Sequence, residues 1–323
     1  MNALRLILRI AVFFFIAIPL QVQAQDVRNP DRYTLDRPDS SSQIVYYFSA
    51  PDGEQKSFPI LVICQGAVES AHRSVLFYNQ SFADWIEPLQ VGCLTIEAWG
   101  IDGEQFNKKE FWEHYTLSQR FEDHLEVIDH FEANPPTGWN GHWIFLGYGD
   151  GGRLATDLAI DVPQTRGVVN MMGAYHSYFE KWWDFCDHLN KHYNALWITD
   201  FLFPFWASSQ YLPWYRSTYT EFIENLIPSP NRFWWKLSYL YHADALSHPP
   251  VDYAKITFPY LVLIQDWNYL FSQTKAFVKA AREAGADIEV ICDENVTGWV
   301  EGKGTLNLFD EAFLWIKDLI QND

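Results

Sequence analysis

Short apolar runs alternate with helical patterns along most of this chain of 323 residues. Residues 59–64, 143–146 and 260–264 are continuously apolar, which is typical of strands covered on both faces. Further strands are expected at 44–48, 93–98, 167–172 and 288–291, and helices at 79–87, 116–131, 151–159, 273–284 and 308–320. Alternation at this spacing predicts βαβ units, and therefore an α/β fold with a mostly parallel sheet and helices on both faces.

The alternation fails between residues 174 and 250, where we expect a helical, aromatic-rich cap insertion over the carboxyl edge of the sheet. Residues 175–241 hold 22 aromatic side chains among 67 residues, against 17% aromatics in the whole chain. Three interpretations stay open. The rings bury area within the cap and on the sheet, or they line a groove for a small apolar or sugar-like ligand. Association with a membrane surface through exposed rings ranks last, because the negative net charge disfavours anionic lipids.

The first 24 residues have the pattern of a secretory signal peptide. Arg5 and Arg9 precede an apolar run at 10–20, and Ala24 ends a small-residue cleavage signal. The run is shorter than the ~20 residues that cross a bilayer, so we expect no stable membrane span after cleavage. The sequence therefore predicts an exported protein, periplasmic or secreted, whose mature domain with its cap insertion occupies residues 25–323.

The amino-acid composition and net charge exclude several classes of protein. A hydrophobic content of 48% excludes a disordered chain. The net charge of −18 argues against nucleic acid as a partner, because phosphate binding requires clustered Lys and Arg. His188 and His192 stand four residues apart, but without the H-E-x-x-H pattern a solvated helix face is favoured over a metal site. The sequence gives no evidence for a cofactor.

A glycine-bracketed turn at 147–152 joins the strand at 143–146 to the helix at 151–159. This turn resembles the nucleophile elbow of the α/β-hydrolase family, with the pattern G-x-S-x-G. Residues 62–66 resemble that family's third strand running into its oxyanion loop, and residues 258–264 resemble the strand before its catalytic acid. The resemblance covers about 46–320 outside the cap. It implies an α/β-hydrolase fold of the serine hydrolase or thioesterase kind.

The positions of the catalytic triad depart from the family pattern. Gly149 stands where the nucleophilic serine is expected, Asn268 where the acid is expected, and Gly298 where the histidine is expected. A shift of two residues would restore an acid as Asp266, but no shift restores the base, because the last histidine of the chain is His248. Loss of even one triad member costs orders of magnitude in rate. Glycine also relieves backbone strain at a tight turn.

The resemblance assigns the oxyanion or ligand-binding region to Gly66, Ala67 and Asp150, with His176 as a further candidate. We expect the Asp150 side chain to cap the following helix or bind a neighbouring amide. Overall, the sequence predicts a catalytically inactive hydrolase-like protein that binds a small molecule or a protein partner. The alternative is an active ester, thioester or peptide hydrolase with a non-standard site, such as an Asp150 nucleophile or His176 paired with Glu69, Ser70, His72 or Asp102.

Overall fold

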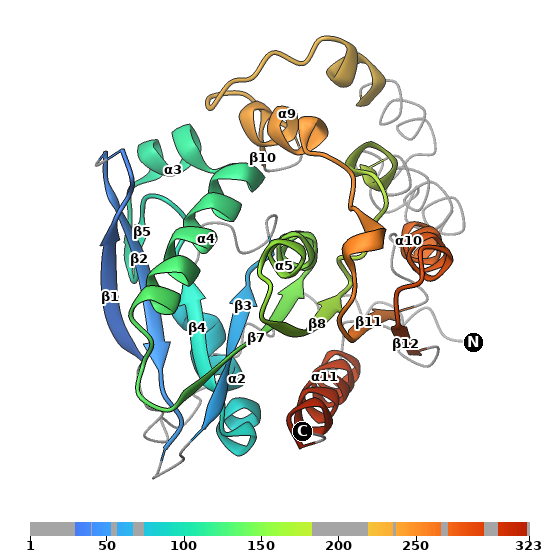
Figure 1. Cartoon of the computed structure of the whole chain (residues 1–323). Helices are drawn as coiled ribbons and strands as arrows, with labels where there is room; N and C mark the ends of the chain where they lie inside the picture. The colour runs from blue at the N-terminus through green and yellow to red at the C-terminus, as the bar shows by residue number, and fades with distance from the viewer. Residues whose placement is uncertain are drawn as a thin grey trace, which may run out of the picture.

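The computed structural model describes residues 30–39, 41–52, 57–66, 74–182, 219–234, 237–265, 271–293 and 303–321. An eight-stranded sheet runs through these residues in the order β1-β2-β4-β3-β7-β8-β11-β12 (Figure 1). From β4 to β12 all neighbouring strands are parallel, while β1 and β2 are antiparallel additions at one edge. The strands are β1 (Asp31–Asp36), β2 (Gln43–Ser49), β3 (Phe58–Cys64), β4 (Gly92–Ile96), β7 (Trp139–Tyr148), β8 (Thr165–Met171), β11 (Tyr260–Gln265) and β12 (Ile288–Asp293).

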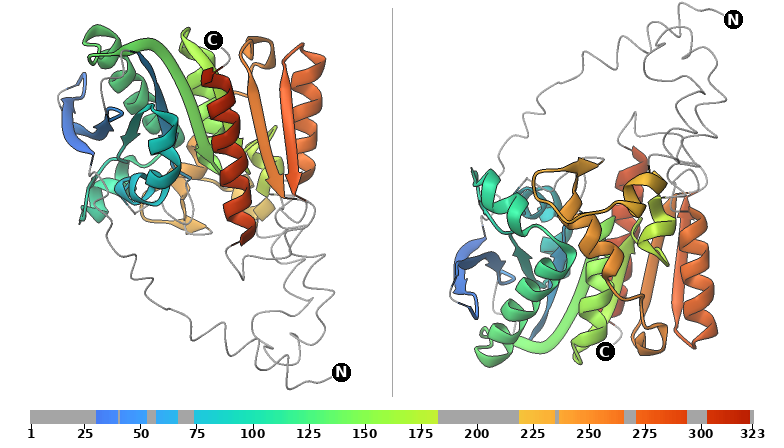
Figure 2. Two further views of the ribbon diagram at one scale, coloured as in Figure 1. Left: turned by 90° about the horizontal axis from the view of Figure 1, so that it is seen from below. Right: turned by 90° about the horizontal axis from the view of Figure 1, so that it is seen from above.

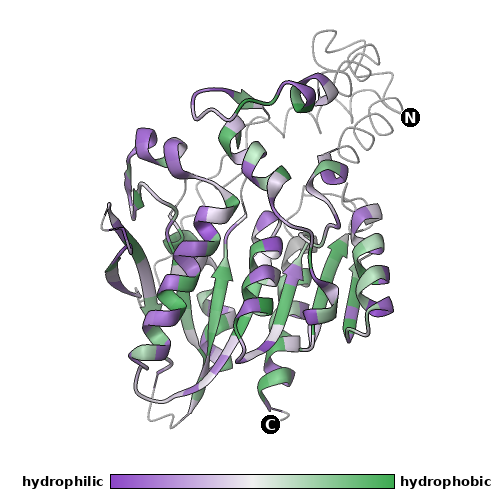
Figure 3. Ribbon diagram, turned by 45° about the horizontal axis from the view of Figure 1, so that its top comes forward, coloured by the Kyte–Doolittle hydropathy of each residue, from purple (hydrophilic) through white to green (hydrophobic). Residues whose placement is uncertain are grey.

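Helices cover both faces of this sheet (Figures 1 and 2). One buried cluster joins the sheet to α4 (Leu117–Ala133), α5 (Asp150–Asp161) and α10 (Phe271–Glu283). A second cluster joins the opposite face to α2 (Leu76–Ile86) and α11 (Lys303–Gln321). The apolar colour of the central strands and the mixed colour of the helices in Figure 3 follow from this layering. The predicted α/β class, with helices on both faces, is confirmed.

The strands β3 and β4 are buried at every position. The continuously apolar run at 59–64 predicted this burial, because a central parallel strand has no solvent face. Cys64 and Cys93, which lie in the strands expected at 59–64 and 93–98, are both buried. Burial raises the pKa of both thiols to about 12. Cys292 is partly exposed instead, because it lies on β12 at the edge of the described sheet.

The segment before β2 contains a strand that the sequence pattern does not predict. Asp31–Asp36 forms strand β1 in full register with β2, from Asp31 opposite Phe48 to Asp36 opposite Gln43. Nearly all of β1 is exposed. An edge strand of this kind is held by backbone pairing to its neighbour and shows no apolar run, so hydrophobic periodicity could not reveal it.

The described parts of the cap lie over the carboxyl edge of the sheet, where α9 (Tyr239–Ser247) packs near α4 (Figure 1). The backbone amide of Ser118, in the first turn of α4, donates to Asp244 Oδ2 of α9 at 3.0 Å. Smaller elements are β5 (Ile101–Asp102), β6 (Gln105–Phe106), α3 (Lys108–His114), β9 (Phe233–Trp234) and β10 (Leu237–Ser238). Residues 183–218 of the cap and the predicted signal peptide at 1–24 lie outside the described residues. None of the helices in the described ranges is both long and apolar enough for a membrane span.

Candidate functional site

The strand-to-helix turn predicted at 147–152 is present at the carboxyl end of β7. The strand ends at Tyr148, the helix α5 begins at Asp150, and Gly149 stands between them with φ 54° and ψ −126°. The Gly149 amide donates to Met171 O of β8 at 2.9 Å, and the Gly152 amide donates to Gly149 O at 2.9 Å. A residue with a side chain is strained at this φ, whereas glycine is not.

Close backbone packing surrounds the turn. A Cβ added at Gly147 would lie well under 3.0 Å from Gly151 O, and a Cβ added at Gly151 would lie equally close to Cys64 O. By contrast, no heavy atom of the described residues lies within 4 Å of the position that a Gly149 Cβ would take. The turn is therefore crowded on its flanks and open at its tip, which is where a nucleophile would stand in an elbow of this kind.

Asp150 is the first residue of α5, and the sequence predicts that its side chain caps this helix or binds a neighbouring amide; its hydrogen bonds go to the cap instead. Its Oδ1 forms an ion pair and hydrogen bond with Lys181 Nζ from the cap. Its Oδ2 accepts a hydrogen bond from Tyr241 OH of α9 at 3.4 Å. Both charged side chains are 1–2% exposed. A carboxylate removed from water in this way needs a cation, and the cap supplies one.

Aromatic rings enclose the Lys181 ammonium. The Nζ atom lies 4.8 Å from the ring centre of Tyr175, 5.1 Å from that of Tyr178 and 5.4 Å from that of Trp182. Burial lowers the pKa of Lys181, and the Asp150 carboxylate offsets part of that effect. Rings of this kind attract a cation through their negative faces. In the described part of the cap, the aromatic residues thus pack on one another and on the ion pair.

A second buried cation lies nearby in α4. The Arg120 guanidinium donates from Nη2 to Gln65 O, at the end of β3, and its Cζ lies 5.6 Å from the centre of the Tyr115 ring. Tyr115 in turn stacks on Tyr241, with ring centres 5.4 Å apart. Among the described residues, the buried Nη1 of Arg120 has no hydrogen-bond partner. Two cations and one carboxylate therefore lie buried around the start of α5.

The structure brings together only some of the predicted site residues. Gly66 lies against the turn, because a Cβ added there would be 2.9 Å from Tyr148 O. Ala67, Asn268 and Gly298 lie outside the described residues. The pairing of His176 with Asp102 is wrong: His176 Nδ1 is 2.7 Å from Tyr253 OH, and Asp102 binds Arg32 through two bonds of 2.6 and 2.7 Å. Glu69, Ser70 and His72 are outside the described ranges.

Another cap histidine is fully engaged. His242 Nδ1 is 2.9 Å from Tyr178 OH, and its Nε2 is 2.9 Å from Trp234 O. Burial lowers the pKa of His242 to about 4, so the ring is neutral at pH 7. Because Trp234 O can only accept, the neutral ring donates from Nε2, and its acceptor nitrogen Nδ1 faces Tyr178 OH. Within the described ranges, no group of three or more His, Cys, Asp or Glu residues is arranged to hold a metal ion.

Sequence reasoning missed Lys181, Tyr241 and Arg120. Asp150 at a crowded turn under a cap does imply a cation in the cap, because a buried carboxylate is paired in stable folds. The cap sequence contains several basic residues, including Lys181, Lys191 and Arg216, and nothing in their spacing along the chain indicates which one meets Asp150. The pairing joins residues 31 positions apart, and no periodic pattern specifies such a contact.

The architecture is similar to that of several solved structures. The chain is similar to a fungal esterase from Rhizomucor miehei at 14% identity and a TM-score of 0.55, over 93% of this chain and 87% of that one. It is similar to Est1E from Butyrivibrio proteoclasticus at 13% identity and a TM-score of 0.54, over 90% of this chain and 98% of that one. It is also similar to a putative dienelactone hydrolase from Klebsiella pneumoniae at 13% identity and a TM-score of 0.50, over 88% of this chain and 98% of that one. No protein-family model and no curated protein matches the chain.

These neighbours define the α/β-hydrolase fold, and at such identities the likeness concerns the fold alone. The chain has that fold, with the expected elbow turn between β7 and α5. What differs is the chemistry at the elbow. Gly149 offers no hydroxyl for attack on a carbonyl, and the next side chain, Asp150, is held in a buried ion pair.

Proposed function

We propose that this chain is an exported protein that keeps the α/β-hydrolase fold as a binding scaffold and does not catalyse serine-hydrolase chemistry. The observation that carries the proposal is Gly149 at the tip of the elbow, where its open side-chain position has no nucleophilic atom. An acyl-enzyme needs such an atom together with a base that removes its proton. The chain has no histidine after His248, where the family's order requires one.

Asp150 is a poor substitute nucleophile. Its carboxylate is neutralised by Lys181 and hydrogen-bonded by Tyr241, so an attack on a substrate would have to break both contacts inside a buried cluster. Breaking one partner from a buried pair costs about 3–5 kcal/mol. The ligand of the scaffold would be a small apolar or sugar-like molecule, or a protein partner, held near the cap.

The test uses mature protein, p-nitrophenyl esters of several chain lengths and a fluorophosphonate probe, with an active esterase as the positive control. We expect neither turnover nor labelling of the wild-type chain. Gly149→Ser is expected to stay unlabelled as well, because a serine hydroxyl without a base is not activated. Turnover or labelling of the wild type that a point substitution such as Asp150→Asn abolishes would overturn the proposal and support the active-hydrolase alternative.

Export has its own test. Expression of the full chain in a Gram-negative host, followed by mass spectrometry of the purified product, is expected to give a mature N-terminus at Gln25. An intact N-terminus on protein recovered from the cytoplasm would contradict export and leave the proposal about the elbow untouched.

A further inference from the structure

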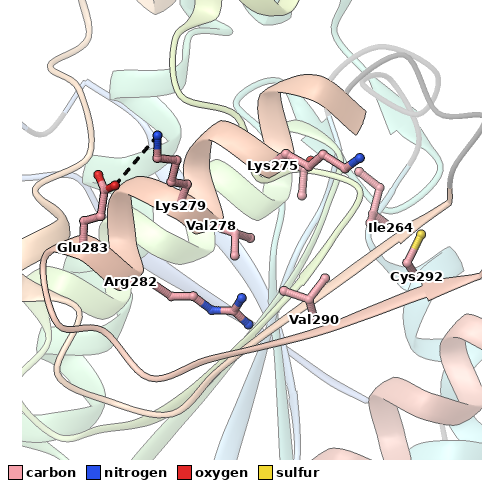
Figure 4. A pocket seen from close by; sticks show the side chains of 9 residues that line it. Ile264, Lys275, Val278, Lys279, Arg282, Glu283, Val290 and Cys292 are labelled. Atoms are coloured by element: carbon pink, nitrogen blue, oxygen red, sulfur yellow. Dashed lines mark ion pairs between the residues drawn. The ribbon is translucent and has the colours of Figure 1, made fainter.

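An open groove lies away from the elbow, between α10 and the last two strands of the described sheet, β11 and β12 (Figure 4). Its volume is about 720 Å³, within the ~300–1,000 Å³ that is usual for small-molecule sites. The lining residues are Ile264, Thr274, Lys275, Val278, Lys279, Arg282, Glu283, Val290 and Cys292. In the sheet order, β11 is two strands from β7, so this groove is distinct from the elbow.

The floor of the groove is apolar. Ile264 of β11 and Val278 of α10 are buried at 2% and 8% exposure, whereas Val290 of β12 is 37% exposed. Figure 4 shows Val278 and Val290 pointing toward each other across the gap between helix and strand. Val290 is exposed because, within the described residues, β12 is the terminal strand and no neighbour covers it. Covering such a side chain with an apolar group is favourable by about 25 cal/mol per Å².

The rim of the groove carries positive charge. In Figure 4, Lys275 and Arg282 lie along the side of α10 that faces the strands, while Lys279 points away and pairs with Glu283 at 3.9 Å. Arg282 Nη2 donates to Ile288 O at 2.7 Å, and a carbonyl partner leaves the guanidinium charge in place. Seven residues of helix place these two cations about 10 Å apart, at the two ends of the apolar floor.

An apolar floor between two cations fits an anionic amphiphile. We propose that this groove binds a medium-chain carboxylate, with its alkyl chain on Ile264, Val278 and Val290 and its head group beside Lys275 or Arg282. Among the described residues, the lining has no aromatic ring on which a sugar would stack. This site goes beyond the proposed function and does not depend on it, because its residues are separate from the elbow.

The test is isothermal titration of the mature protein with monomeric decanoate at low ionic strength. We expect saturable one-to-one binding, no binding of acetate, and binding of decyltrimethylammonium at least about tenfold weaker than that of decanoate, since the cationic head meets the same cations. Absence of decanoate binding, or equal affinity for the two decyl compounds, would refute the proposal. The latter result would identify a groove that reads the alkyl chain alone.

Variants locate the site. Lys275→Glu and Val290→Glu are each expected to weaken decanoate binding at least about tenfold. Lys109→Glu is the control, because Lys109 is likewise an exposed helical lysine but lies on α3, and the affinity of this variant for decanoate should stay within about twofold of the wild type. If Val290→Glu fails to fold, Val290→Ala takes its place, and the expected loss of decanoate affinity is then smaller. Unchanged affinity in Lys275→Glu and the Val290 variant would place decanoate elsewhere and overturn the proposal.

A second copy of the chain is the competing occupant, because an exposed terminal strand can pair with itself. Sedimentation velocity without ligand distinguishes the two. A monomer supports the proposal, whereas a dimer that Val290→Glu dissociates would show that this face is an interface and would overturn it.

Discussion

The flanks and the tip of the elbow turn obey different constraints. At Gly147 and Gly151 a side chain would collide with backbone atoms, so packing alone demands glycine there. At Gly149 the space is open and only the positive φ favours glycine. The comparison teaches that the shape of an elbow is fixed by the close approach of β3, β7 and α5. The residue at the tip can change without altering that shape, so a hydrolase turn can persist without its nucleophile.

The largest effect is expected on the flank. Gly151→Ala places a Cβ against Cys64 O, and backbone cannot move aside as a flexible side chain does. We expect a loss of about 3–5 kcal/mol in the free energy of unfolding, the upper range for overpacking, measured by urea denaturation. A loss below about 1 kcal/mol would show that β3 and α5 are not in close contact, and the contrast between flank and tip would fail.

Next in size is the ion pair beside the tip. Lys181→Met leaves the Asp150 carboxylate buried with Tyr241 as its remaining described partner, so we expect a loss of about 3–4 kcal/mol. Thermal and urea denaturation at pH 7 measure it. In the double variant Asp150→Leu/Lys181→Met both charges are absent, and most of that stability should return. If the double variant is no more stable than Lys181→Met, the pair is not coupled and Asp150 must be stabilised in another way.

Sequence alone gave the central strands, the two-sided sheet and the elbow, because each rests on a local pattern. Residues 59–64 are continuously apolar, which predicts a strand buried on both faces, and the glycines at 147 and 151 mark a tight turn. The contacts that define the chemistry were not local. Asp150 meets Lys181 and Tyr241 from the cap, at separations of 31 and 91 residues, and strand β1 is recognised only through its partner β2.

Glu97 offers a contrast to Asp150, as a buried carboxyl without a cation. It follows β4 and accepts hydrogen bonds from the neutral donors Ser74 Oγ, Val75 N at 3.0 Å and Gly103 N at 3.3 Å. Burial raises the pKa of Glu97 to about 7, and these donors oppose the rise. Between pH 4.5 and 7 the folded chain therefore holds a proton that the unfolded chain has lost, so stability falls as the pH rises through this window.

The expected decrease from Glu97 is about 3 kcal/mol across that window. Urea denaturation at pH 5, 6 and 7, compared between wild type and Glu97→Gln, isolates it, since His124 and His242 contribute equally to both proteins. The free energy of unfolding of the wild type should fall relative to that of Glu97→Gln as the pH rises. A difference independent of pH would mean that Glu97 titrates normally, and that a buried carboxyl here needs no cation such as Lys181.

The smallest effect is expected at the tip itself. Gly149→Ser meets no described atom within 4 Å of its Cβ, so only the backbone strain at φ 54° opposes it, about 1–2 kcal/mol. Gly149→Ala should cost the same in urea denaturation, because the strain comes from the Cβ and not from the hydroxyl. A loss as large as that of Gly151→Ala would mean that the space above Gly149 is filled, and the tip would then be constrained by packing like its flanks. Equal, small losses of unfolding free energy in Gly149→Ser and Gly149→Ala would instead show that only backbone strain, and no collision with neighbouring atoms, favours glycine at this position.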